Sequence, residues 1–292
     1  MEQEPPLAFL DVPTLLESSE PRPRVPWLRI LIIGCLTLIV IAAFSAGAGG
    51  GSVLQGFAWG LSAFIILAIP WVLQFTLRQV KMEQAAVQGI AELVQLRRWP
   101  ESAMALQQFL SRPARTQQLR AEAIVYLAAV LSRYHRFDDA IAVHNYLLEH
   151  DLLNAGAAYG VRMGRAMAML REDHLFDADR SISELRRIGP RDSAGFALVE
   201  IYRDVLTGHP EDAIGIFVEK LPALRDQLGH RLGDVYALLA RAYDLLDRKT
   251  EAADAFKRAT LLSPIVELCR RYPEVQKLVG RYEPAAAPSE MS

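Results

Sequence analysis

Hydrophobic and polar positions divide the chain into two unlike parts. From Ile30 to Leu77 no residue is charged, whereas charged residues recur every few positions from there to the end. In this second part apolar residues recur at helical spacing between short polar turns, and no stretch shows the alternation expected of a strand. The pattern predicts an all-α protein whose main boundary lies near residue 83.

The uncharged stretch is long enough for two membrane-spanning helices, since each span needs about 20 apolar residues. The glycine-rich segment Gly47–Ser52 divides it, and glycine is a poor helix former. We therefore expect a transmembrane hairpin within residues 27–83, with helices at about 28–46 and 53–77. Trp27 and Trp71 lie near the span ends, where indole rings favour the headgroup layer.

Two other interpretations of the first span remain open. It could be a secretory signal peptide, because Phe44, Ser45 and Ala46 offer small residues for cleavage. The preceding region, however, is long and partly acidic, and the apolar stretch exceeds the usual ~7–15 residues. It could also be a buried helix of a soluble domain, although its complete lack of charge disfavours that reading. Gly56 and Gly60 form a GxxxG motif that suits close helix packing, or reflect the frequency of glycine in membrane helices.

Basic residues flank the uncharged stretch on both sides: Arg22, Arg24, Arg29, Arg78 and Lys81. The positive-inside rule then places both flanks in the cytoplasm. We expect a two-span protein of the cytoplasmic (inner) cell membrane whose helical part lies on the cytoplasmic side. Residues 1–26 are rich in proline and acids, which predicts a disordered tail.

The helical part repeats, and the clearest unit spans residues 233–266. Eight of its positions carry a recognisable signature: Tyr236, Leu239, Ala240, Tyr243, Ala252, Phe256, Ala259 and Pro264. Small side chains let the two helices touch, large rings fill the space between them, and a proline ends the second helix. The unit resembles a tetratricopeptide repeat, and six of these eight residues are identical to that family's signature.

Weaker copies precede it, and residues 84–266 form about five helix-turn-helix units. The upstream units are 84–117, 121–154, 159–192 and 194–227, and the small residues that open the second helices are Ala103, Ala140, Ala178, Ala213 and Ala252. The third and fourth units fit best with the first helix moved by one residue, which predicts a shorter turn. The inward residues are then Met163, Ala166, Met167 and Leu170, and Leu198, Ile201, Tyr202 and Val205.

Residues 267–292 are expected to form a capping helix and a tail. Leu268, Leu278 and Val279 would cover the last unit, while Arg270, Arg271 and Lys277 face water. Such a cap is needed because an α-solenoid otherwise ends on an apolar face. The predicted fold class is thus an all-α, tetratricopeptide-like solenoid with a capping helix, preceded by two transmembrane helices.

Composition and motifs argue against several functions. Residues 78–292 carry 29 acids and 29 bases, so they have no excess positive charge for nucleic acid. Cys35 and Cys269 make no disulfide framework, and no histidine stands in a metal-binding or catalytic motif. We expect no catalytic, cofactor-binding or metal-binding residue, no small-molecule substrate, and no enzymatic activity.

The resemblance implies a protein-binding function. We expect a membrane-anchored scaffold or adaptor that recruits another protein or a peptide segment through its repeat groove. The alternative is a structural subunit of a larger membrane assembly for transport, secretion or the envelope, with the repeats as a docking arm. No residue supports a third alternative, an enzyme completed by a partner.

Three arginines are candidate partner-binding residues in the groove. The shifted register aligns Arg165 and Arg203 with Arg241, and together they would suit a partner with carboxylates. In the alternative reading these arginines pair with Glu200, Asp204 and Asp244, or face water.

Overall fold

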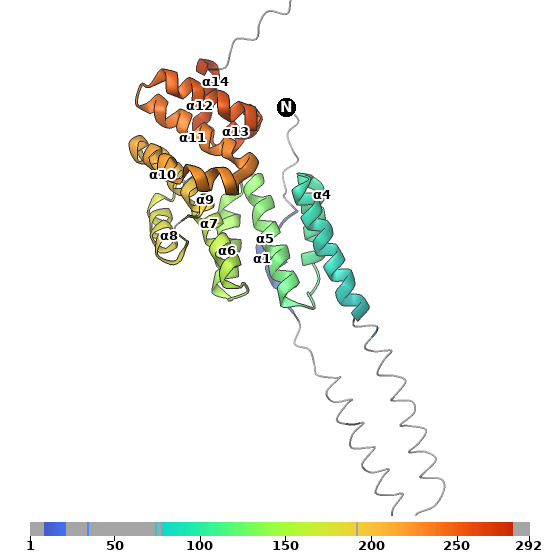
Figure 1. Cartoon of the computed structure of the whole chain (residues 1–292). Helices are drawn as coiled ribbons and strands as arrows, with labels where there is room; N and C mark the ends of the chain where they lie inside the picture. The colour runs from blue at the N-terminus through green and yellow to red at the C-terminus, as the bar shows by residue number, and fades with distance from the viewer. Residues whose placement is uncertain (1–8, 22–33, 35–73, 75–76, 191, 283–292) are drawn as a thin grey trace, which may run out of the picture. The chain divides into compact units, whose positions relative to one another are not determined.

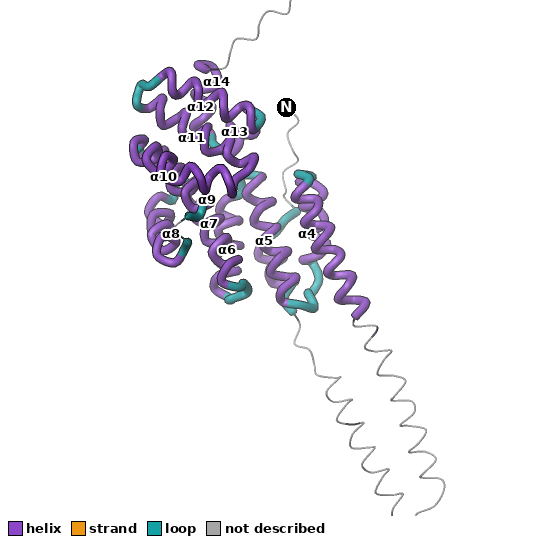
Figure 2. Tube along the Cα trace, in the orientation of Figure 1, coloured by secondary structure: helices purple, strands orange, loops and turns teal. Residues whose placement is uncertain are grey.

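The computed structural model describes residues 9–21, 34, 74, 77–190 and 192–282 (Figure 1). The chain divides into two compact units, Met1–Asp139 and Ala140–Ser292. Within the described residues all regular secondary structure is helical, and short turns join successive helices (Figure 2). The all-α prediction is confirmed for this part of the chain.

The helices follow one another as five consecutive pairs. These are residues 77–95 with α4 (Trp99–Leu110), α5 (Gln117–Arg133) with α6 (Phe137–Glu149), α7 (Ala155–Arg171) with α8 (Leu175–Ile188), α9 (Ala194–Thr207) with α10 (Pro210–Leu228), and α11 (Leu232–Leu245) with α12 (Lys249–Leu262). Each helix pair falls close to one of the five units expected from the sequence.

All five pairs turn in the same way. One residue in each turn has a positive φ: Arg97, His135, Asp173, Gly208 and Asp247. The N–H of the next residue donates to a carbonyl five residues back, at 2.8 to 3.0 Å in every pair. This is the Schellman arrangement, which satisfies carbonyl groups left open at a helix end. The turn residues therefore fix the repeat register independently of the apolar pattern.

That register corrects one expected position. The fifth residue after the left-handed turn residue is fully buried in every pair, namely Ser102, Ala140, Ala178, Ala213 and Ala252. In the first pair this residue is Ser102, so the prediction of Ala103 was one residue late. A serine fits because its hydroxyl donates to the Trp99 carbonyl at 2.8 Å within the helix, and Ala103 is buried beside it.

The predicted shorter turn occurs in only one of the two pairs. The turn between α9 and α10 contains two residues, whereas three residues separate α7 from α8, as in the other pairs. The shifted inward register is confirmed: Ala166, Leu170, Leu198, Ile201, Tyr202 and Val205 are buried, and Met163 and Met167 pack partly buried against the same core.

The first unit contains a helix that the sequence did not predict. Residues 9–21, expected to be part of a disordered tail, include α1 (Val12–Ser18), which packs against α4. Leu10, Val12, Leu15 and Leu16 are buried. The disorder prediction was wrong here because three of these side chains fall on one helical face, and Pro13 is tolerated in the first turn.

Hydrogen bonds fasten this helix to the repeat residues of the first unit. Arg120 at the start of α5 is only 3% exposed, and it donates to the Leu16 carbonyl at 2.7 Å and the Ser19 hydroxyl at 3.0 Å. Ser18 donates to the Leu110 carbonyl at 2.9 Å. Residues 9–21 are thus an integral part of the first unit.

The C-terminal cap consists of α13 (Ile265–Arg271), the short 3-10 helix η2 (Pro273–Val275) and α14 (Gln276–Tyr282), not one helix. Pro273 cannot continue the helix, which explains the break. Leu268 and Leu278 are buried, as expected. Arg271, predicted to face water, instead pairs with the fully buried carboxylate of Asp234 at 2.6 Å. The cap is therefore fixed by charge as well as by apolar burial.

The two predicted membrane spans lie almost entirely outside the described residues, which include only residues 34, 74 and 77 of them. Among the helices that are described, none combines the length and apolar character needed to cross a bilayer.

Candidate protein-binding cleft

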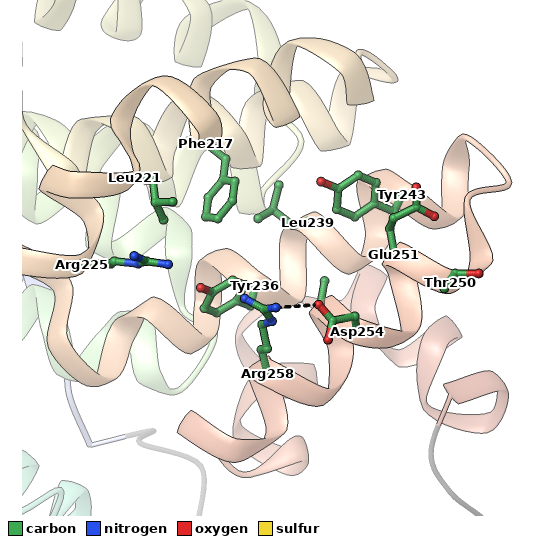
Figure 3. A pocket seen from close by; sticks show the side chains of 11 residues that line it. Phe217, Leu221, Arg225, Tyr236, Leu239, Tyr243, Thr250, Glu251, Asp254 and Arg258 are labelled. Atoms are coloured by element: carbon green, nitrogen blue, oxygen red, sulfur yellow. Dashed lines mark ion pairs between the residues drawn. The ribbon is translucent and has the colours of Figure 1, made fainter.

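Three consecutive helices of the second unit enclose a cleft of about 420 Å³ (Figure 3). Its lining comes from α10 with Phe217, Leu221 and Arg225, from α11 with Tyr236, Leu239 and Tyr243, and from α12 with Thr250, Glu251, Asp254, Ala255 and Arg258. The α10 residues are four apart, and the α11 residues three and four apart, so each set occupies one helical face. The helical period therefore places the side chains of each set on the face that lines the cleft.

Aromatic rings form much of the cleft wall. The rings of Phe217 and Tyr236 meet edge to face with centroids 5.8 Å apart. The guanidinium of Arg258 lies 5.8 Å from the Tyr236 ring centroid and forms an ion pair with Asp254 at 3.0 Å, as Figure 3 shows. Such rings offer a rigid apolar surface, with polar groups only at the edges.

The rim of the cleft carries both signs of charge. Glu251 pairs with Arg248 at 2.7 Å, and hydrogen bonding from Arg248 lowers the pKa of this carboxyl. Arg225 is exposed, and no carboxylate of the described residues forms an ion pair with it. The cleft therefore combines an apolar floor with an uncompensated cation on its α10 side.

Pro222 lies inside α10, immediately after Leu221. A proline within a helix removes one backbone hydrogen bond, and its ring conflicts with the carbonyl four residues earlier. Phe217 and Leu221 are only partly buried, although they stand where a repeat helix normally packs. The cleft thus exposes apolar side chains beside a proline that lies within a continuous helix.

The three predicted arginines have different surroundings. Arg165 on α7 is half-buried and donates to the Asn145 side chain at 3.1 Å and the Ser181 hydroxyl at 3.4 Å. Burial lowers the pKa of its guanidinium. No carboxylate of the described residues forms an ion pair with Arg165. Its hydrogen bonds are to neutral groups within the second unit.

The other two arginines each pair with a carboxylate on their own helix, and Arg203 also lies 3.8 Å from Asp179 of α8. Arg203 lies 2.9 Å from Asp204 and Arg241 lies 2.9 Å from Asp244. These contacts match the alternative that the sequence left open, except that Glu200 pairs with Arg186 instead, at 2.5 Å. Joint binding of a partner by the three arginines stays a prediction.

The signature residues of the last pair occupy their expected places, with one exception. Seven of the eight are as expected, since Tyr236, Leu239, Ala240, Ala252, Phe256 and Ala259 are buried and Pro264 precedes α13. Tyr243 is partly exposed and lines the cleft. The sequence reading missed Phe217, Leu221 and Arg225 as site residues, and the signal that could have found them is Pro222 inside the helix.

The first unit has a second cleft, of about 350 Å³, between residues 77–95 and α5. Its lining is rich in amides and includes Gln84, Gln88 and Gln118. Lacking an aromatic wall, it is a weaker candidate for anchoring a partner. Among the described residues no group of histidine, cysteine, aspartate and glutamate is placed to hold a metal ion.

The fold is similar to a solved tetratricopeptide repeat protein, the thermophilic protein TTC0263 from Thermus thermophilus. The match has a TM-score of 0.50 and 20% sequence identity, and it covers 67% of this chain and all of that one. Comparison with known protein families found no match, and comparison with curated proteins found none either. The described helices thus have a tetratricopeptide-like fold.

Proposed function

We propose that this protein is a membrane-anchored scaffold that recruits a partner protein through the cleft between α10, α11 and α12. The main support for this proposal is the partly exposed apolar surface of Phe217 and Leu221, which lie beside Tyr236 in an open cleft. Apolar and aromatic pockets of this kind hold the anchor residues that dominate protein interfaces. The tetratricopeptide-like fold supports the same function.

The membrane anchor in this proposal is the pair of spans at residues 28–46 and 53–77. Its support is the long uncharged stretch in the sequence together with one feature of the first unit. Residues 9–21 pack against α4 and α5, which supports a topology in which the chain before and after the proposed spans lies on one side of the membrane. A segment that leaves and returns to the same side crosses a membrane an even number of times.

Arg78 and Lys81, which follow the second proposed span, suggest that this side is the cytoplasm. Topology reporters fused after residue 50 and after residue 83 should therefore give opposite sides, with the second one cytoplasmic. Two reporters on the same side would overturn the two-span anchor.

The recruiting function is tested by quantitative co-purification from detergent-solubilised membranes. Leu221→Glu places a charge in the cleft, whereas Val218→Glu places the same charge on an exposed position of the same helix outside the cleft. We expect the protein partners recovered with the unaltered chain to be lost with Leu221→Glu and kept with Val218→Glu. Equal recovery with all three chains would reject the cleft as the recruiting site.

A further inference from the structure

Leu110 on α4 and Leu221 on α10 hold the same position in two different repeats. Each follows the left-handed residue of its own turn, Arg97 or Gly208, by the same number of residues. Leu110 is fully buried, whereas Leu221 is partly exposed and lines the open cleft. The same comparison holds one turn earlier, where Leu106 is fully buried and its counterpart Phe217 is partly exposed.

In the first unit a segment from outside the repeats packs beside this position. α1 packs along α4, where Ser18 donates to the Leu110 carbonyl and Gln107 donates to the Phe9 carbonyl at 3.4 Å. The apolar face of α1 is buried in this contact. A short amphipathic helix is therefore what this molecule itself places beside this position of the repeat.

We propose that the cleft between α10, α11 and α12 receives a short acidic amphipathic helix of the α1 type, supplied by the recruited partner. This proposal rests on the proposed function and names the chemistry of its partner. The partner segment presents two adjacent bulky aliphatic residues, as Leu15 and Leu16 do in α1, to Phe217 and Leu221.

Size and charge both fit such an occupant. α1 has seven residues, so it is about 10 Å long, and the cleft of about 420 Å³ can take the apolar side chains of one face of such a helix. The segment 9–21 carries three acids and no base. On the rim, Arg225 has no ion pair with the described residues and would meet an acidic group of the partner helix.

The test uses the full chain in detergent and a fluorescently labelled peptide of residues 9–21. We expect saturable binding, measured by fluorescence anisotropy, that is lost when the peptide carries Leu15→Asp and Leu16→Asp. In the protein, Leu221→Glu should weaken binding by about tenfold or more, because a carboxylate among apolar groups loses its hydration. The matched variant Val218→Glu should change the affinity by less than about twofold.

A photoreactive group at Val12 of the peptide separates this cleft from the site of α1 itself. Cross-links to α10, α11 or α12 support the proposal, and cross-links to α4 or α5 overturn it because the peptide then only exchanges with α1. Absence of saturable binding, or equal effects of the two glutamate variants, also overturns it. If the peptide fails while partner recovery still depends on Leu221, the proposed function stands and the helical occupant is rejected.

Discussion

The first and fourth helix pairs use the same repeat position in opposite ways. In the first pair α1 packs against α4, and Leu106 and Leu110 belong to the core. In the fourth pair no described segment covers Phe217 and Leu221, which line a cleft. The difference shows that a repeat position does not by itself decide between core and surface.

The largest expected effect compares Leu110→Ala with Leu221→Ala. Removing the fully buried Leu110 side chain should cost about 4 kcal/mol of unfolding free energy, through lost transfer energy and a cavity. Removing the partly exposed Leu221 side chain should lower the unfolding free energy by only about 1 kcal/mol, since this side chain buries less apolar surface. Denaturant unfolding of the detergent-solubilised chain measures both. Equal losses of unfolding free energy would show that Leu221 is as buried as Leu110 and that the cleft is closed in solution.

Next in size is the loss of the arginine that holds α1. Arg120→Met should cost about 3 kcal/mol, because the buried Leu16 carbonyl and Ser19 hydroxyl lose their donor. Hydrogen exchange should rise in residues 9–21 while α11 and α12 stay protected. The exposed Arg98→Met serves as the control, since Arg98 pairs with Glu101 at the surface. Unchanged exchange in α1 would contradict its anchoring by Arg120.

A third test measures how the unfolding free energy depends on pH through two buried groups of the second unit. Burial lowers the pKa of His144 to about 4, and its Nδ1 has no hydrogen-bond partner among the described residues. The native state thus favours neutral His144, and this contribution to stability is lost as the pH falls from about 6.5 toward 4. Between pH 7 and pH 5 the loss should be about 2 kcal/mol.

Asp204 acts in the opposite direction within the same unit. Burial raises the pKa of its carboxyl to about 6, so native Asp204 takes up a proton before the unfolded chain does. Its contribution to stability is present at low pH and lost as the pH rises through 6, which amounts to about 1 kcal/mol between pH 5 and pH 7. Measured against the unaltered chain by denaturant unfolding, His144→Asn should gain stability as the pH falls from 7 to 5, and Asp204→Asn should lose it. Parallel slopes for the three chains would refute these assignments.

The smallest effect is expected at the rim of the cleft. Arg258 pairs with Asp254 in an exposed position, so Arg258→Ala should leave the melting temperature unchanged. If the cleft is a binding surface, the same variant should still alter partner recovery, because Arg258 flanks Tyr236. A large drop in melting temperature would assign Arg258 to the fold instead.

The helix pairs were predictable because each depends on local periodicity. The sequence also contains a register signal that the apolar pattern obscures: a basic residue or histidine, two residues, and then an acid, directly after each left-handed residue. Arg98 with Glu101 and Arg248 with Glu251 form ion pairs in this arrangement. Read together with the turn, this signal identifies Ser102, and not Ala103, as the small residue of the first pair.

The features that the sequence did not predict depend on contacts between residues that are far apart along the chain. The role of α1 rests on Arg120, about a hundred positions away, and composition alone assigned that segment to a disordered tail. The cleft requires knowing that Phe217 and Leu221 lack a cover among the described segments, whereas their residue types predict burial. Arg271 looked like a solvated surface charge because its partner Asp234 lies on another helix.

The packing of α1 has a consequence for biosynthesis. Leu16 and Arg120 are 104 residues apart, so at about 5–20 residues per second α1 waits roughly 5–20 seconds on the ribosome for its partner helix. Under the proposed topology the segment between them inserts into the membrane during that wait. An insertion error that carried the N-terminus across the bilayer would leave α4 without its cover. The exposed leucines of α4 would then mark the nascent chain as faulty.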